Sequence, residues 1–311
     1  MNVIVMSTYN GGAYLRRQLD SVLCQSVPEF VLLVRDDGSS DDTLAILQSY
    51  DDPRIRILTG ENLGPSGSFF ALLEEARKMG AEHVFFCDQD DIWLPNKLEV
   101  LLEEIRALPA GPALVFSDFA MIDGEDAITG DSYAAMAQLR IPADGNFFPK
   151  LLAQPYIFGC ASVLNRALLD LIATPPAGVE MYDCWIGLVC AIFGRVKYLP
   201  KATLQHRFHS SNATGRSGMN SLSARVKRVT GQLKQQTVNT RLRLTQAQLL
   251  LDRYGDQIPA EKRPMLQALA RAGRTGGFSA TRTLKQYGVS RGGALQNIFF
   301  YVTAFINKGE Q

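Results

Sequence analysis

The sequence lacks the motifs that mark several common nucleotide-binding and hydrolytic folds. No GxGxxG follows the first apolar run, which argues against a nicotinamide site, and no GxxxxGK[ST] is present to hold a triphosphate. A GxSxG elbow for a hydrolase nucleophile is also absent. A nucleotide site in this chain would therefore have to use carboxylates, amide side chains and a metal ion.

Paired cysteines and long hydrophobic runs are missing as well. The five cysteines are odd in number and form no CxxC pair, which argues against a disulfide framework and a zinc site. The most apolar late stretch, residues 294–306, is interrupted by Gln296 and Asn297 and is too short to span a bilayer. The first residues read as a strand without the basic flank of a secretion signal. We therefore expect a cytoplasmic protein, which could lie on the cytoplasmic face of the inner membrane.

Charge is balanced over the whole chain but not along it. Residues 1–220 carry 17 Lys and Arg against 27 Asp and Glu, whereas residues 221–311 carry 15 against 4. The acidic part favours cation binding, and the basic part favours an anionic surface such as a membrane leaflet or nucleic acid. With 46% hydrophobic residues, the chain can also bury a substantial core.

Short apolar runs alternate with amphipathic segments in the first 120 residues. This pattern predicts an α/β fold in which helices cover both faces of a mostly parallel sheet. Beyond residue 220 the apolar residues recur at helical spacing, which predicts a helical C-terminal extension, with a linker or turn at residues 273–277. The expected strands of the first part are residues 2–6, 30–35, 54–58, 82–88 and 113–118.

Polar or acidic residues follow four of these strands. They are residues 7–10, 36–41, 62–64 and 88–91. Because ligands of open parallel sheets collect at the carboxyl ends of the strands, we expect these segments to form one site. The run Asp88-Gln89-Asp90-Asp91 places three carboxylates after a buried strand, where a divalent cation carrying a phosphate would relieve their repulsion. The alternative is a solvated acidic turn before the helix that starts at Pro95.

The same segments resemble the signatures of the family 2 inverting glycosyltransferases. The resemblance continues through residues 181–185 and 206–212, so it covers about the first 215 residues. The run from Asp88 to Trp93, Asp-Gln-Asp-Asp-Ile-Trp, is similar to the bacterial rhamnosyltransferase-like branch. The resemblance implies a GT-A fold and a nucleotide-sugar donor whose diphosphate is held by Mg²⁺ or Mn²⁺.

The resemblance also assigns residues to the donor nucleotide. Thr8, Tyr9 and Asn10 correspond to the base-binding loop, and Asp37 to the carboxylate that accepts a hydrogen bond from the base. Asn62 joins this nucleotide-sugar group. The alternatives are packing for Tyr9 and a helix N-cap for Asp37.

The metal site corresponds to the acidic run. Asp90 would ligate the cation, and Asp88 would lie nearer the ribose and could also reach the metal. His209 could complete the metal shell or bind phosphate, or could be structural. Arg207 could face the phosphates or pair with a surface carboxylate.

Inversion needs one base for the acceptor hydroxyl, and Asp183 matches the position at which the family places it. Cys184 departs from the Asp-Trp-Trp pattern that is frequent in the branch, and Asp183 could instead cap the following helix. Asp91 could contact the sugar or the acceptor, or organise the loop. Trp185 could stack on a sugar ring or fill the core.

These assignments divide the chain at residue 215. We expect a GT-A domain over 1–215, with a nucleotide-sugar half at 1–120 and an acceptor and catalytic half at 121–215, followed by a basic helical region at 216–311. The tail could dock on a membrane that holds a lipid-linked acceptor, or serve as a helical extension or an oligomer interface. No nucleic-acid partner is expected.

The leading functional hypothesis is transfer of L-rhamnose from dTDP-L-rhamnose to a surface polysaccharide or lipopolysaccharide glycan. A UDP-hexose-dependent glycosyltransferase is the nearest alternative, because the donor pocket cannot be read from sequence. A nucleotidyltransferase would need a Gly-rich basic loop after Val5, which is absent. A catalytically silent glycan- or nucleotide-binding protein remains a further alternative, against which the metal carboxylates and Asp183 argue.

Overall fold

The computed structural model describes the chain apart from residues 144, 173–174, 209–221 and 308–311, and describes no side chains for residues 222–234. The five predicted strands are present as β1 (Asn2–Thr8), β2 (Phe30–Asp36), β3 (Ile55–Thr59), β4 (His83–Cys87) and β6 (Ala113–Ile122). The sequence did not predict β5 (Ile92–Trp93), β7 (Ile128–Gly130), β8 (Ser162–Asn165) and β9 (Arg195–Arg207).

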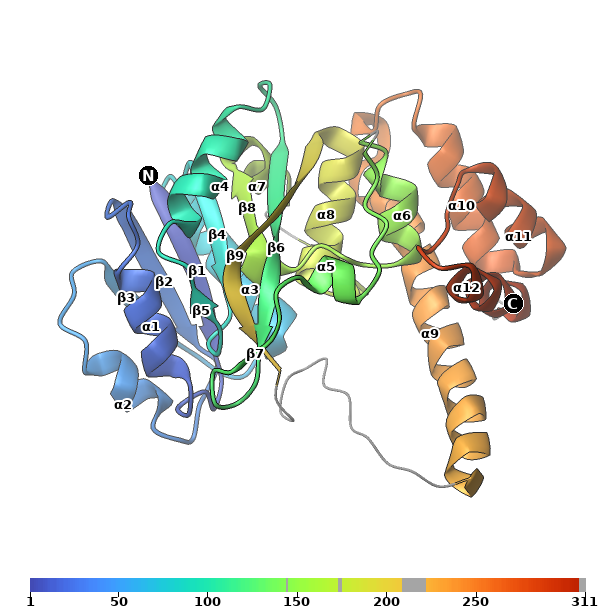
Figure 1. Cartoon of the computed structure of the whole chain (residues 1–311). Coiled ribbons are helices and arrows are strands. Elements are labelled where there is room, and N and C mark those ends of the chain that lie inside the picture. The colour runs from blue at the N-terminus through green and yellow to red at the C-terminus, as the bar shows by residue number, and fades with distance from the viewer. Residues whose placement is uncertain (144, 173–174, 209–221, 308–311) are drawn as a thin grey trace.

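These strands form one mixed sheet in the order β3-β2-β1-β4-β8-β6-β9-β5, with β7 pairing β6 at the side (Figure 1). β1 runs parallel to β2 and β4, and β2 runs parallel to β3. β8 lies antiparallel between β4 and β6, and β5 and β7 are also antiparallel to their partners. The register pairs Thr8 with Asp36 and Met6 with Cys87, so the ends of β1, β2 and β4 reach the same edge.

Helices cover both faces of the sheet because the side chains of β1 alternate between two cores. Val3 and Val5 pack with α3 and α8, whereas Ile4 and Met6 pack with α1 and α4. The helices of this part are α1 (Leu15–Leu23), α2 (Thr43–Gln48), α3 (Gly64–Lys78), α4 (Lys97–Arg106), α5 (Tyr133–Met136), α6 (Phe147–Ala153), α7 (Arg166–Ile172) and α8 (Tyr182–Phe193). One short 3-10 helix, η1 (Gly159–Ala161), precedes β8.

The C-terminal region is helical, as predicted, in the part that the structure describes. Its elements are α9 (Leu222–Tyr254), the 3-10 helix η2 (Gly255–Gln257), α10 (Arg263–Thr275), α11 (Gly277–Gln286) and α12 (Ala294–Ile306). They lie on the side of α6 and α8 that faces away from the sheet (Figure 1). The turn expected at 273–277 is shorter, because α10 continues to Thr275 and Gly276 alone makes the break at a φ of 59°.

The expected boundary at residue 215 falls within the span 209–221, which lies outside the described residues. Within the described residues, no helix combines the length and the apolar character needed to cross a bilayer.

Candidate functional site

Hydrogen bonds join the loops that follow β1 and β2. Thr8 is buried, and its Oγ1 donates to Asp36 Oδ1 at 3.1 Å. Asn10 has a φ of 47°, a left-handed conformation that Asn tolerates well, and its Oδ1 accepts a hydrogen bond from the Ser40 backbone N–H at 2.8 Å. The two loops therefore form one surface at the edge of the sheet, as predicted.

Gln89 ties the acidic run to the loop after β1. The Tyr9 backbone N–H donates to Gln89 Oε1 at 2.9 Å, and Gln89 Nε2 donates to the Tyr9 carbonyl at 3.1 Å. A Cβ at Gly11 would lie 2.1 Å from Gln89 Oε1, so a larger residue there would displace the Gln89 side chain from these two hydrogen bonds. Tyr9 itself is 49% exposed, which leaves its ring accessible at the edge of the site.

Asp37 joins the end of β2 to the start of α3. It is buried, accepts hydrogen bonds from the backbone N–H groups of Leu63 and Gly64, each at 2.9 Å, and pairs with Arg35. Asn62 Oδ1 accepts from the same Gly64 N–H at 2.9 Å. Both residues predicted to bind nucleotide thus hold the beginning of α3, a capping role like the alternative raised for Asp37. Contact of Asp37 with a base stays a prediction.

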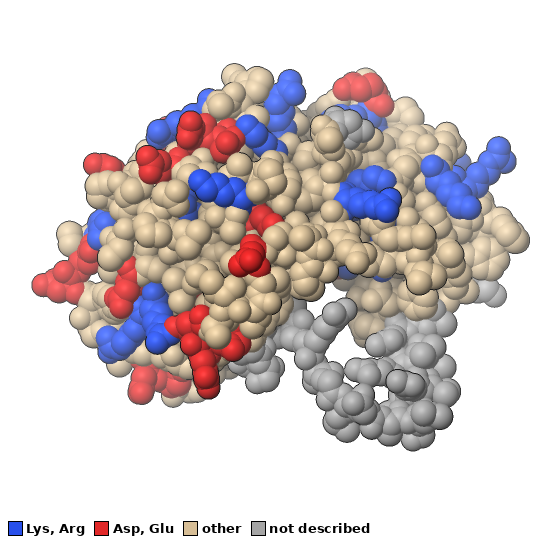
Figure 2. Space-filling view, viewed as in Figure 1, with Lys and Arg blue, Asp and Glu red and all other residues tan. Residues whose placement is uncertain are grey.

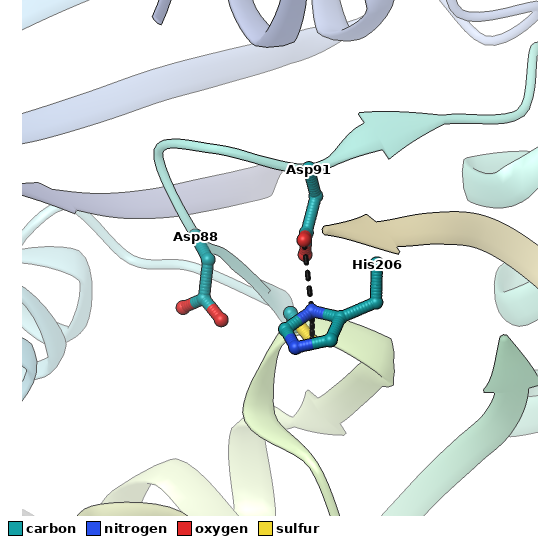
Figure 3. Close-up of side chains that lie close together, drawn as sticks. Asp88, Asp91 and His206 are labelled. Atoms are coloured by element: carbon teal, nitrogen blue, oxygen red, sulfur yellow. Dashed lines mark hydrogen bonds and ion pairs between the residues drawn. The ribbon is translucent and has the colours of Figure 1, made fainter. Parts of the chain in front are cut away.

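A cluster of four potential ligand groups lies beside these loops. Single atoms of Asp88, Asp91, Cys160 and His206 lie within 4.8 Å of one another. Figure 3 shows Asp88 and Asp91 on the turn between β4 and β5, and His206 reaching Asp91 from β9. His206 Nδ1 is 2.8 Å from Asp91 Oδ1, whereas the buried Asp91 Oδ2 has no hydrogen-bond partner among the described residues.

Burial and repulsion shift the proton affinities of this cluster. Burial, followed by the charges of Asp91 and Asp90, raises the pKa of Asp88 to about 7. Burial alone would lower the pKa of His206, but the Asp91 carboxylate outweighs burial and raises it to about 9. Burial would in turn raise the pKa of Asp91, but His206 lowers it. At neutral pH the Asp91–His206 pair is therefore ionised, and Asp88 is close to its midpoint.

The donor chemistry fits a hard divalent cation held by Asp88 and Asp91. Mg²⁺ and Mn²⁺ prefer carboxylate oxygens, and Asp91 Oδ2 is a buried oxygen that accepts no hydrogen bond from the part of the chain that the structure describes. Burial raises the pKa of the Cys160 thiol well above its ordinary value, so the thiol stays protonated and is a poor ligand for such ions. His206 could ligate only after losing its proton.

The composition of this cluster differs from the predicted metal ligands. Asp90 lies outside the four-residue group, His209 lies outside the described residues, and His206 and Asp91 take part instead. His206 lies inside the stretch 206–212 that carries the family resemblance, but nothing local distinguished it from His209. Metal ligation by Asp90 and His209 stays a prediction.

Arg207 supports the acidic turn from inside the protein. Its guanidinium is fully buried, donates from Nε to the Asp90 carbonyl at 2.8 Å and from Nη1 to the Asp123 carbonyl at 2.7 Å, and pairs with Asp126. It also lies 4.4 Å above the ring of Tyr14. This position does not favour the predicted contact with donor phosphates, because these groups enclose the charge.

Asp183 lies in the first turn of α8 and contacts Gly159, the residue before Cys160 of the acidic cluster. Its Oδ2 accepts a hydrogen bond from the Gly159 N–H at 3.3 Å, and its Oδ1 accepts from the Cys184 N–H at 2.8 Å. Burial raises the pKa of this carboxyl. A carboxylate with raised proton affinity at the edge of a site is suited to accept a proton from a hydroxyl.

The expected contact of Trp185 with a sugar is wrong for this structure. Trp185 is 0% exposed, and its ring stacks on Tyr254 of α9 with centroids 6.3 Å apart. Trp185 therefore belongs to the core, the second of the two roles that the sequence allowed.

Asp91 is also 0% exposed, so it faces the acidic cluster rather than open solvent.

Comparisons with known proteins show which sequences the chain resembles. A family model described as Glycosyl transferase family 2 matches residues 3–172. The UDP-Glc:alpha-D-GlcNAc-diphosphoundecaprenol beta-1,3-glucosyltransferase of Escherichia coli is 30% identical over 188 residues, which cover 60% of this chain and 68% of that protein. An uncharacterized glycosyltransferase of Rickettsia prowazekii is 29% identical over 58% of this chain and 56% of its own length. The chain thus spans little more than half of that second relative.

Solved structures match over most of the chain. TarS of S. aureus, residues 1–349 in complex with UDP-GlcNAc, has a TM-score of 0.59 at 17% identity, covering 92% of this chain and 80% of that chain. The mannosyltransferase PcManGT of Pyrobaculum calidifontis, in complex with GDP-Man and Mn²⁺, has a TM-score of 0.55 at 16% identity, with 92% and 72% coverage. At such identities the likeness concerns the fold, and it confirms the predicted GT-A architecture.

Proposed function

The chain belongs to glycosyl transferase family 2, and we propose that it moves a sugar from a nucleotide-sugar donor to a glycan acceptor with inversion and with help from a divalent cation. The observation that carries the proposal is the acidic cluster of Asp88 and Asp91 at the edge where β1, β2, β3 and β4 end, with Asp183 hydrogen-bonded to Gly159, the neighbour of Cys160 in that cluster.

Each group has a role that its surroundings support. The exposed ring of Tyr9 would stack on the base, and Asp88 and Asp91 would hold Mg²⁺ or Mn²⁺. The cation would neutralise the nucleoside diphosphate as it leaves. Asp183 would accept the proton of the acceptor hydroxyl, and a single base of this kind is sufficient for inversion.

The donor has two candidates. The run from Asp88 to Trp93 resembles the rhamnosyltransferase-like branch and favours dTDP-L-rhamnose, whose β-linked sugar would give an α-linkage. The similar Escherichia coli enzyme is named for UDP-Glc, which favours a UDP-hexose. That enzyme is also named for a GlcNAc-diphosphoundecaprenol acceptor, so we propose a lipid-linked glycan that leads to a surface polysaccharide as the acceptor class here.

The test is release of nucleoside diphosphate from a panel of dTDP-L-rhamnose, UDP-Glc, UDP-GlcNAc and GDP-Man, with and without Mn²⁺. Asp183→Asn should lose at least about 100-fold in transfer while keeping donor affinity, because the amide cannot take the proton. Asp88→Asn and Asp91→Asn should instead weaken Mn²⁺ binding, and Asp90→Ala tests the ligand expected from sequence. Asp51→Asn, an exposed carboxylate before β3, is the matched control.

Near-wild-type transfer by Asp183→Asn would contradict the assignment of Asp183 as the base. Equal activity with and without a chelator would contradict the role of the divalent cation. Failure to release nucleoside diphosphate from any donor of the panel would favour a catalytically silent binding protein.

A further inference from the structure

The last helix of the described chain is apolar on the side that faces solvent. Leu295 is 83% exposed, Ile298 61%, Val302 44% and Phe305 40%. Successive residues of a helix are about 100° apart, so these positions share one face of α12. The opposite face is buried through Phe300, Thr303 and Ala304. A helix that is apolar nearly all round normally has a partner on both sides.

α11 extends this apolar face. Phe278 is 82% exposed, and its ring lies edge-on against Phe305 with centroids 4.8 Å apart. Arg282 and Lys285 follow Phe278 at spacings of four and seven, so both exposed cations lie on the same side of α11. The docking face is therefore defined as Phe278, Arg282, Lys285, Leu295, Ile298, Val302, Phe305 and Ile306.

The surrounding charge has a single sign. Residues 262–307 contain seven Lys and Arg and no Asp or Glu. In the view of Figure 2, acidic groups gather on the left, over the part that holds β1–β4, whereas the right-hand part formed by the C-terminal helices shows mainly basic and uncharged groups. Such a surface attracts anionic partners and repels a second copy of itself.

We propose that the docking face binds the surface of an anionic membrane. The apolar side chains of α11 and α12 enter the boundary between headgroups and acyl chains, and Arg282 and Lys285 contact lipid phosphates. α12 has 13 residues, so it lies along the surface and does not cross it. Repulsion between two such basic faces argues for a lipid surface over self-association.

The experiment is co-sedimentation of the full-length chain with vesicles of phosphatidylcholine alone or mixed with phosphatidylglycerol. The wild type should bind the anionic vesicles and lose binding in high salt. Leu295→Ser with Ile298→Ser, and separately Arg282→Gln with Lys285→Gln, should each reduce partitioning at least about tenfold. Ile128→Ser with Met136→Ser changes similarly exposed apolar residues away from the face and should bind like the wild type.

Every changed side chain is exposed, so each variant should keep the cooperative thermal unfolding of the wild type. Equal binding of the wild type to neutral and anionic vesicles, or unchanged binding of both face variants, would overturn the proposal. A wild-type dimer that Leu295→Ser with Ile298→Ser dissociates would assign the face to a second copy instead. The assay contains no donor or acceptor, so its outcome is independent of the proposed reaction.

Discussion

Among single residues, Asp88 and His206 are the two members of the acidic cluster whose raised pKa values fall between about pH 7 and about pH 9. Both hold their protons more tightly in the folded chain, with pKa values raised from 3.8 to about 7 and from 6.5 to about 9. A group whose pKa is raised on folding stabilises the folded state fully at pH values below its pKa in the unfolded chain. This stabilisation is lost as the pH rises through its pKa in the folded chain. We therefore expect stability to fall between about pH 4 and about pH 9.

Thermal unfolding across this pH range measures the effect. Asp88→Asn should flatten the lower part of the fall and His206→Gln the upper part, whereas Asp51→Asn should follow the wild type. Added Mn²⁺ should raise the melting temperature most above about pH 7, since the metal replaces the protons. A wild type and an Asp88→Asn variant with the same pH dependence would contradict the prediction.

The sequence located the acidic residues of the site but not their individual positions. Asp88 and Asp37 could be predicted because each directly follows an apolar strand. The direction of each side chain within the turn after β4 could not be predicted, and the structure places Asp91 rather than Asp90 in the cluster with Asp88 and His206. The pairing of Asp91 with His206 joins residues from β5 and β9 regions far apart in sequence, and no local pattern encodes it.

Among the elements, α3 begins in a way that depends on a residue outside it. Its N-cap residue, Leu63, makes no side-chain cap, and Asp37 supplies the acceptor from the end of β2. We expect Asp37→Ala to lower the free energy of unfolding by ~3 kcal/mol, because it leaves the buried Arg35 guanidinium without its carboxylate partner and the Leu63 N–H without an acceptor, whereas the Gly64 N–H keeps Asn62 Oδ1.

Urea unfolding, together with KM for the donor, distinguishes residues that hold the structure from residues that bind the donor in the variants Asp37→Ala, Asn62→Ala and Tyr9→Ala. Asn62 is exposed and duplicates one contact of Asp37, so its loss should cost less than about 1 kcal/mol. Tyr9→Ala should leave stability almost unchanged and raise KM for the donor. An Asp37→Ala variant with wild-type stability would show that the carboxylate is not needed to hold α3.

The elements themselves were predictable where the burial pattern was strong. β1, β2 and β4 are continuous apolar runs covered on both faces, and sequence alone placed them within a few residues. β9 was missed because it is only partly buried over most of its length and contains Pro200, so neither alternation nor an apolar run marks it. β5 has only two residues, which no periodicity can reveal.

For the whole molecule, the C-terminal helices share a core with the sheet. Leu244, Leu266 and Phe300 belong to the same buried cluster as Val3 and Trp185. Polar contacts also join α9 to the first part of the chain. Arg243 pairs with Glu180, and the Tyr254 hydroxyl donates to the Leu171 carbonyl at 3.1 Å. The sequence predicted a change of character near residue 215, but a change of charge does not show whether the two parts fold separately.

A chain that ends at residue 220 tests whether the first part is stable alone. This shortened chain lacks Tyr254, so the rings of Trp185 and Phe193, whose centroids lie 6.3 and 4.9 Å from that of the Tyr254 ring, would be exposed. We therefore expect the shortened chain to aggregate or to unfold without a cooperative transition.

Tyr254→Ala in the full-length chain gives a graded version of the same test. It should cost ~3 kcal/mol by urea unfolding, because it leaves a cavity between α8 and α9. Val238→Ala, at a residue of α9 that is 52% exposed, should stay within about 0.5 kcal/mol of the wild type. A monomeric 1–220 chain with cooperative unfolding and wild-type donor affinity would instead establish an independent GT-A domain, and the shared core would then be a docking interface between two folding units.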